Sequence, residues 1–352
     1  MFDVFGGSVK ALDGAAVASI QARIDGKTKP PGALGELEHL ARQLALITAP
    51  DGQAQIQLQR PQMWVFAADH GIASAGVSIA PSEVTQQMVM NFANGGAAIN
   101  CFCRSADMAL TVVNAGMLAS VNHPAVVEAS LGQGTQDISR EPAMTLEQCH
   151  VGLSKGAALI TAQAEQGTNV FGFGEMGIGN TSAAAAVLSA LLQRPASETV
   201  GRGTGISDEV LMRKTQLIEQ ALERHAQLPE ADSVGVILAS LGGFEMVQMV
   251  GAMIGAAQMR SVVLVDGFIA TAAALAAVRL APEVREYMVF CHRSEEQAHA
   301  LALTALQARP LFDLSLRLGE GTGAALALPL LKAAAAFYND MASFADAGVT
   351  EV

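Results

Sequence analysis

The sequence predicts an α/β fold built around a parallel sheet, and two observations indicate it. Short runs rich in β-forming residues each end in a polar or glycine-rich turn that a helical pattern follows; they span residues 63–71, 109–116, 168–177, 261–268 and 286–294. These runs are apolar throughout instead of alternating, which is typical of parallel strands covered on both faces. Strand–helix alternation favours right-handed crossovers. The predicted class is therefore a parallel, doubly wound (Rossmann-like) sheet with a second, smaller helical domain.

Residues 233–240, SVGVILAS, are a candidate for one more strand. This run opens a long apolar stretch that ends at Met259, which raises the alternative of a membrane span. Glu245 and the Gly242-Gly243 break inside the stretch favour a buried strand followed by a buried helix.

The N-terminal and C-terminal segments both have helical patterns in place of strands. The N-terminal segment contains a turn, KPPGALGELE, at residues 29–38. We predict a large α/β domain over residues 46–299, which holds the ligand site, and a small helical domain built from residues 1–45 and 300–352. The catalytic loop is expected near their junction.

Composition excludes several classes of function. The net charge of -12 argues against nucleic acid and against an anionic membrane surface, because both require basic patches. The N-terminus carries no basic-plus-apolar leader, so a cytoplasmic location is expected. The four cysteines show no repeated metal-ligand spacing and are expected to be free, buried thiols.

Polar residues gather where the predicted strands end. Asp69-His70, Glu175, Asp266 and His292 all occupy such positions. In open parallel sheets ligands bind outside the carboxyl ends of the strands, so a site is expected there. A strand-end Asp also often caps the next turn, which is the structural alternative for Asp266.

The segment GFGEMG, residues 172–177, matches a dinucleotide-binding fingerprint that follows a strand. An NAD site would also need a second strand ending in an acid about 20 residues further on. Glu198 lies at a suitable distance, but its neighbourhood does not resemble a strand. The match alone is weak.

The fuller stretch GEMGIGNTSAAAA, residues 174–186, indicates an anion site. Glycines let the backbone approach a ligand, and Asn180 and Thr181 open an alanine-rich helix whose N-terminus attracts negative charge. Alternatively, Thr181 or Ser182 simply caps this helix.

A second glycine-rich turn, GRGTGISDE at residues 201–209, precedes another helix, with Ser207 as its expected cap. Lys214 falls on the apolar stripe of that helix, with Val210, Leu217 and Ile218. It either extends past its neighbours to solvent or points inward to neutralise a phosphate, and periodicity alone favours neither.

A lone carboxylate, Glu320, lies between two glycines in RLGEGTGAALAL, residues 317–328. As a structural residue it would be a first-turn acid of the helix that follows.

Six segments together resemble the family of nicotinate-nucleotide–dimethylbenzimidazole phosphoribosyltransferases. They occur in family order over nearly the whole chain: KPPGALGELE, AADHGIASAGVSIAPSEVTQQMVMNFANGGAAIN, VFGFGEMGIGNTSAAAAV, GGFEMVQMVGAMIGAA, VLVDGFIATAAALAA and RLGEGTGAALAL. The resemblance implies a homodimer with a large parallel α/β domain and a small domain from both chain ends. It also implies transfer of 5-phosphoribose from nicotinate mononucleotide to 5,6-dimethylbenzimidazole, with inversion. No metal or other cofactor is expected, because the sequence has no acidic pair with the placement of a pyrophosphate-type metal site.

The resemblance also implies roles for individual residues. Glu320 matches the family's general base, which takes the proton from the ring nitrogen that does not attack, and Glu175 matches a second acid near the ribose and the base. Phosphate and ribose contacts are expected from Gly177, Asn180, Thr181, Gly203, Lys214 and Asp266. The base pocket is expected to contain Ala80, Pro81, Met88, Met176 and Leu318. Ala80 and Met88 replace polar side chains of some members, which leaves the preferred base open.

Three other functions remain as alternatives. A nicotinamide-dependent oxidoreductase would need the missing acidic strand end. A non-catalytic binder of a nicotinate nucleotide would not need both Glu320 and Glu175. A transporter would need the apolar stretch after residue 233 to span a membrane.

Overall fold

The computed structural model describes residues 7–49, 54–203 and 205–350. The strands are β1 (Gln62–Ala68), β2 (Ala109–Gly116), β3 (Val126–Glu128), β4 (Val170–Met176), β5 (Val262–Val265), β6 (Met288–Phe290), β7 (His292–Ser294) and β8 (Phe312–Leu316). The α-helices are α1 (Val17–Asp25), α2 (Glu36–Thr48), α3 (Glu83–Ala93), α4 (Ala98–Ala106), α5 (Leu146–Ala164), α6 (Asn180–Leu192), α7 (Ala196–Thr199), α8 (Asp208–His225), α9 (Val234–Leu241), α10 (Phe244–Gln258), α11 (Phe268–Leu280), α12 (His299–Ala305), α13 (Thr322–Asp340) and α14 (Phe344–Ala347).

The main sheet has six strands in the order β3-β2-β1-β4-β5-β6, and every neighbouring pair is parallel. This is the strand order of a doubly wound sheet, so the predicted parallel, doubly wound sheet is confirmed, while the second, smaller helical domain remains a proposal. β1 and β4 lie at its centre and pair from Gln62 with Phe171 to Ala67 with Met176. The strand order reverses between β1 and β4, which places a ligand crevice outside their carboxyl ends.

Two predictions from the strand pattern need correction. Residues 234–241 form helix α9, so the strand predicted over 233–240 is wrong. The apolar run 286–294 divides: β6 completes the main sheet, while β7 pairs with β8 in a separate parallel pair. The short strands β3 and β8 were not predicted.

The glycine- and alanine-rich composition is explained by close packing of α5 against α10. A Cβ on Gly156 would lie 1.9 Å from the carbonyl oxygen of Gln248, and one on Gly251 would lie 2.0 Å from that of Leu153. Backbones in such contact leave no room for a side chain. α10 packs in turn on β1, β2, β4 and β5, so it covers the centre of the sheet.

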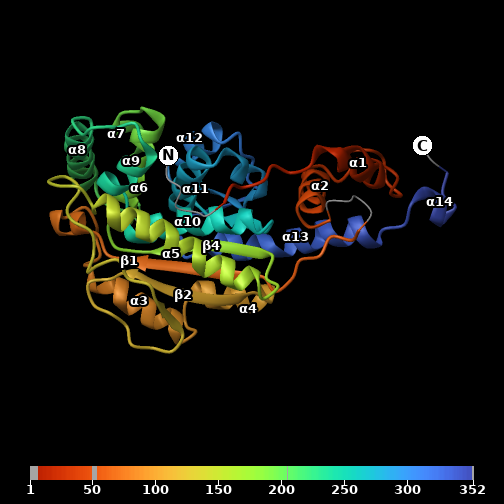
Figure 1. Cartoon of the computed structure of the whole chain (residues 1–352), viewed down its shortest axis with the longest axis horizontal. Coiled ribbons are helices and arrows are strands. Elements are labelled where there is room, and N and C mark those ends of the chain that lie inside the picture. The colour runs from red at the N-terminus through yellow and green to blue at the C-terminus, as the bar shows by residue number, and fades with distance from the viewer. Residues whose placement is uncertain (1–6, 50–53, 204, 351–352) are drawn as a thin grey trace.

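Helices from the two terminal segments, namely α1, α2, α14 and the last part of α13, lie together at one end of the molecule (Figure 1). Lys27 and Ser343 form an isolated antiparallel bridge between them. α13 also packs on α4 and β4, so this one helix connects the sheet with the terminal helices. The division at residues 45 and 300 remains a proposal, and residues 1–6 and 351–352 of the small domain lie outside the described residues.

No helix in the described part of the chain is both long enough and apolar enough to cross a bilayer. The apolar stretch after residue 233 is instead the buried pair α9 and α10. The cysteines are free; Cys103, Cys149 and Cys291 are buried as expected, but Cys101 is exposed.

Candidate active site

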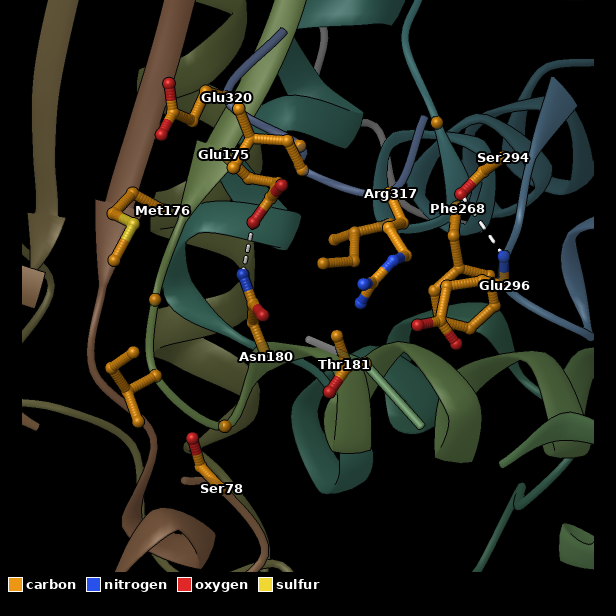
Figure 2. Close-up of a pocket in the computed structure, with 18 of the residues that line it drawn as sticks. Ser78, Glu175, Met176, Asn180, Thr181, Phe268, Ser294, Glu296, Arg317 and Glu320 are labelled. Atoms are coloured by element: carbon orange, nitrogen blue, oxygen red, sulfur yellow. Dashed lines mark hydrogen bonds between the residues drawn. The ribbon is translucent and has the colours of Figure 1, made fainter. Parts of the chain in front are cut away.

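A cavity of about 310 Å³ opens at the carboxyl ends of β1 and β4. Its walls include every residue predicted for the site except Pro81, namely Ala80, Met88, Glu175, Met176, Gly177, Asn180, Thr181, Gly203, Lys214, Asp266, Leu318 and Glu320. Pro81 precedes α3 and is not part of the wall. Figure 2 shows Met176 and Glu320 on one side, Phe268, Ser294 and Glu296 on the other, and Arg317 between them.

The N-terminus of α6 forms one wall of the cavity. No side chain caps this helix, and its N-cap is Gly179 in a left-handed conformation with φ 97, so neither Thr181 nor Ser182 is the cap. Gly177 lies so close to β1 that a Cβ there would be 2.2 Å from the carbonyl oxygen of Ala68. An uncapped helix N-terminus that faces a cavity is a site for an anion.

Lys214 supplies a positive charge at the same wall. Its side chain points inward from α8, which Ser207 caps as expected, and only 1% of the residue is exposed. Nζ donates to Thr181 Oγ1 at 2.8 Å and to the carbonyl oxygen of Gly201 at 3.4 Å. Burial lowers the pKa of Lys214 to about 8, partly offset by the Glu296 carboxylate. The side chain therefore points inward, and it links the two glycine-rich turns through these contacts with Thr181 and Gly201.

Glu175, at the end of β4, adds a buried carboxyl group to the cavity wall. It is 7% exposed, and its carboxylate accepts a hydrogen bond from the amide of Asn180, which Figure 2 shows beneath it. Burial raises the pKa of Glu175 to about 8, with further increases from the charges of Asp266 and Glu245. The carboxyl group also accepts the backbone N–H of Glu320, so it contacts the turn that carries the other acid.

Glu320 lies in a turn of three left-handed residues, with φ 83 at Gly319, 62 at Glu320 and 85 at Gly321. The residue is 5% exposed, and Oε2 is buried without a hydrogen-bond partner. Burial raises the pKa of Glu320 and the charge of Asp266 adds to the increase, while the backbone N–H of Ile99 opposes it. A buried carboxylate with a free oxygen and a raised pKa can accept a proton from a bound ligand.

The side of the cavity nearest Met176 is apolar. Its wall combines residues from the segment before α3, from α3 itself and from the turns after β4 and β8: Val77, Ala80, Val84, Met88, Met176, Ile178 and Leu318. Ser78 is the polar side chain among them. Such a surface fits a flat, apolar ring.

Several wall residues were not predicted from the sequence, and they come mainly from β7, β8 and the segments next to them. They are Ser78, Arg202, Phe268, Ser294, Glu296 and Arg317. Of the polar residues expected at the strand ends, His292 also lines the cavity, whereas Asp69 and His70 do not. Arg317 directly precedes Leu318 and Glu320 in the RLGEG segment, which is the signal that could have identified it. Glu198, the acid required by the dinucleotide alternative, lies in α7 and not at a strand end, so that alternative fails.

An anion site next to two buried carboxylates and an apolar ring pocket, at the switch point of a doubly wound sheet, defines an enzyme that acts on a phosphorylated nucleotide and a flat base. A family model described as phosphoribosyltransferase matches residues 9–349. The chain belongs to the nicotinate-nucleotide–dimethylbenzimidazole phosphoribosyltransferase family.

Individual relatives agree with this assignment. The proteins of that name from Photobacterium profundum and Shewanella oneidensis are 56% and 55% identical, over 94% and 95% of this chain and 96% and 94% of theirs. The crystal structure of CobT from Thermus thermophilus has a TM-score of 0.91 at 42% identity and covers 96% of this chain and 99% of that one.

Proposed function

We propose that the enzyme transfers 5-phosphoribose from nicotinate mononucleotide to 5,6-dimethylbenzimidazole or a related base. The products are nicotinate and α-ribazole 5′-phosphate, the nucleotide of the cobalamin lower ligand. The observation that carries this proposal is the meeting of Glu320, Glu175 and the Lys214 anion site in one cavity with an apolar wall. A protein that only binds the nucleotide would not need a buried carboxylate with a free oxygen.

The chemistry follows from the residues on each wall. The benzimidazole lies on the apolar side, and one ring nitrogen attacks the anomeric carbon while Glu320 Oε2 takes the proton from the other. The bond from that carbon to the pyridinium nitrogen breaks, and its electron pair neutralises the nicotinate ring. Departure therefore needs no general acid, and catalysis depends on positioning and electrostatics.

The nucleotide is held mainly through its phosphate. We assign this contact to the N-terminus of α6, with Gly177, Asn180 and Thr181, and to Lys214 and Gly203 from the second glycine-rich turn. Glu175 lies between this site and Glu320 and faces the ribose. Asp266 also lines the cavity, but its oxygens accept backbone hydrogen bonds, and its role is considered below.

The reaction is tested by nicotinate release from nicotinate mononucleotide, measured with and without 5,6-dimethylbenzimidazole. The proposal requires release that depends on the base. Saturable nucleotide binding without release in the presence of any base would identify a non-catalytic binder instead.

Gly174→Ala is expected to impair catalysis through the Glu320 turn. A Cβ at this position would lie 2.4 Å from the nitrogen of Gly321 and 2.5 Å from the carbonyl carbon of Glu320, so the turn must move. Displacement by about 1 Å costs on the order of a hundredfold in rate. Gly172→Ala on the same strand is the control, because its Cβ would meet the flexible ends of Met63 and Met108. Equal activities of the two variants would contradict this.

The apolar wall predicts a preference for 5,6-dimethylbenzimidazole over adenine. Adenine would bury an amine against this wall without a partner, which costs about 1–3 kcal/mol, or roughly five- to a hundredfold in kcat/KM. Met88→Gln adds a hydrogen-bond donor and acceptor to this wall, so it should bring the kcat/KM values for the two bases closer together. Competition between the two bases measures the ratio of these values. An equal preference for both bases in the unmodified enzyme would refute this use of the wall.

The family resemblance also leads us to propose a homodimer and a cytoplasmic location. Three apolar residues, Ile79, Met212 and Leu314, are at least 60% exposed in the single chain. They are candidates for a subunit contact. Sedimentation equilibrium gives the oligomeric state directly.

A further inference from the structure

Glu320, between two left-handed glycines, is held in a backbone conformation that glutamate does not favour. A left-handed φ of 62 is uncommon for glutamate, and such strained residues persist only where surrounding contacts fix them. The turn passes so close to β4 at position 174 that only a glycine fits at that position. The contacts that hold this turn therefore decide where the Glu320 carboxylate lies.

Asp266, at the end of β5, makes the largest set of these contacts. Its Oδ2 accepts the backbone N–H of Gly321 at 3.2 Å, its Oδ1 accepts that of Ala324 at 3.0 Å, and Gly323 donates to it as well. The side chain is almost fully buried. α13 has no capping side chain of its own, so a residue from another element performs that function.

His292 of β7 lies next to the Asp266 carboxylate. Its Nε2 lies 3.6 Å from Asp266 Oδ1, and its Cδ2 would be 2.0 Å from a Cβ on Gly323. His299 stands next to it, with Nδ1 accepting the N–H of Ser294 and Nε2 therefore donating to Thr271 Oγ1 at 2.9 Å. Burial lowers the pKa of His299 to about 3, so this second ring is neutral.

We propose that Asp266 is a positioning residue for the general base: it fixes the 319–324 turn and thereby the Glu320 carboxylate, and it does not bind the nucleotide. This inference rests on the proposed function, because it needs Glu320 to accept the proton. Its physical basis is that both carboxylate oxygens are already occupied by backbone donors of the turn.

The variant that removes this function with least change of shape is Asp266→Asn. The asparagine amide would place an N–H₂ group against a backbone N–H, so one contact to the turn becomes repulsive. We expect kcat to fall by about ten- to a hundredfold, while the Kd of nicotinate mononucleotide, measured by calorimetry, changes less than about threefold. A rise in Kd that accounts for the whole loss of kcat/KM would make Asp266 a nucleotide ligand and overturn the proposal.

A double-mutant cycle separates positioning from a general loss of structure. If Asp266 acts through Glu320, then Asp266→Asn should cost less than about threefold in the background of Glu320→Gln. Loss by the same factor in both backgrounds would contradict the proposal. Thermal unfolding of each variant shows that the compared proteins are folded.

The pH profile tests whether the Asp266 charge acts on Glu320, because that charge raises the pKa of Glu320. The charged or titratable groups that face Asp266 and Glu320 are Glu175 from β4, His292 from β7 and Cys291 beside it. Loss of the Asp266 charge should lower the pKa of Glu320, so the acid limb of kcat/KM should move to lower pH in Asp266→Asn. Asp266→Glu keeps the charge but has a longer side chain, so its kcat should fall while the acid limb of its kcat/KM profile stays at the same pH.

These outcomes separate the inference from the function on which it rests. An unmodified enzyme that releases nicotinate normally, with Asp266→Asn equally active and its acid limb unmoved, would overturn the inference alone. An unmodified enzyme that shows no base-dependent release would overturn the proposed function, and the role of Asp266 with it.

Discussion

Glu320→Gln is expected to lower kcat for base-dependent nicotinate release by about 10²- to 10⁴-fold, the usual contribution of a general base. Glutamine keeps the size of the side chain and can stay in the turn, but it cannot accept the benzimidazole proton. The KM for the nucleotide should change little, because the phosphate site lies on the far wall. Steady-state rates over a range of both substrates measure the two effects separately.

Two observations would confirm that this loss comes from the missing base. Burial raises the pKa of Glu320, so kcat/KM of the unmodified enzyme should fall as the pH drops through a value above the ordinary glutamate range. This limb should be absent from the residual activity of the variant. An acid limb that persists unchanged in the residual activity of Glu320→Gln would contradict the assignment.

Lys214→Met should weaken nucleotide binding more than any other substitution at the phosphate wall. Methionine keeps the apolar stem but leaves the bound phosphate without its buried counter-charge, a loss of about 2–5 kcal/mol, or on the order of a hundredfold or more in Kd. Calorimetric titration with nicotinate mononucleotide measures this. A Kd within twofold of the unmodified value would remove Lys214 from the phosphate site.

The same lysine predicts how binding depends on pH. Its pKa of about 8 in the free enzyme means that the ammonium is lost as the pH rises through 8, while a bound phosphate favours its charged form. Binding should therefore weaken above pH 8 and take up a proton there, as titrations in buffers of different ionisation enthalpy can show. Lys155→Met is the control, because Lys155 also donates to backbone carbonyls but lies outside the cavity wall.

The mostly buried strands of the main sheet were predictable, whereas the largely unburied strands β3 and β8 were not. β1, β2, β4 and β5 follow from apolar runs that end in polar turns. Residues 234–241 have the same apolar character, but they are enclosed on all sides as a helix, and periodicity cannot distinguish the two in so short a run. β3 and β8 are short, and most of their side chains are not buried, so no apolar run marks them.

The site was predictable where its residues follow the central strands. Glu175 lies at the end of β4, Gly177 and Asn180 follow it, and Asp266 follows β5. The direction of the Lys214 side chain could be determined only from the structure. An amphipathic pattern predicts the helix face on which a residue lies, but not which elements pack against that face. Ser294, Glu296 and Arg317 come from the β7–β8 pair and its neighbours, whose position depends on tertiary packing alone. The contacts of Asp266 with the 319–324 turn are likewise long-range, so no local pattern could reveal them.

The central claim is that phosphoribose moves from nicotinate to the base with inversion. The most direct measurement follows nicotinate release and nucleotide formation together, from nicotinate mononucleotide and 5,6-dimethylbenzimidazole, and determines the anomeric configuration of the product by NMR. The expected result is one α-linked nucleotide for each nicotinate released, with the yield collapsing in Glu320→Gln. Nicotinate released without a nucleotide product, or a β-linked product, would contradict it.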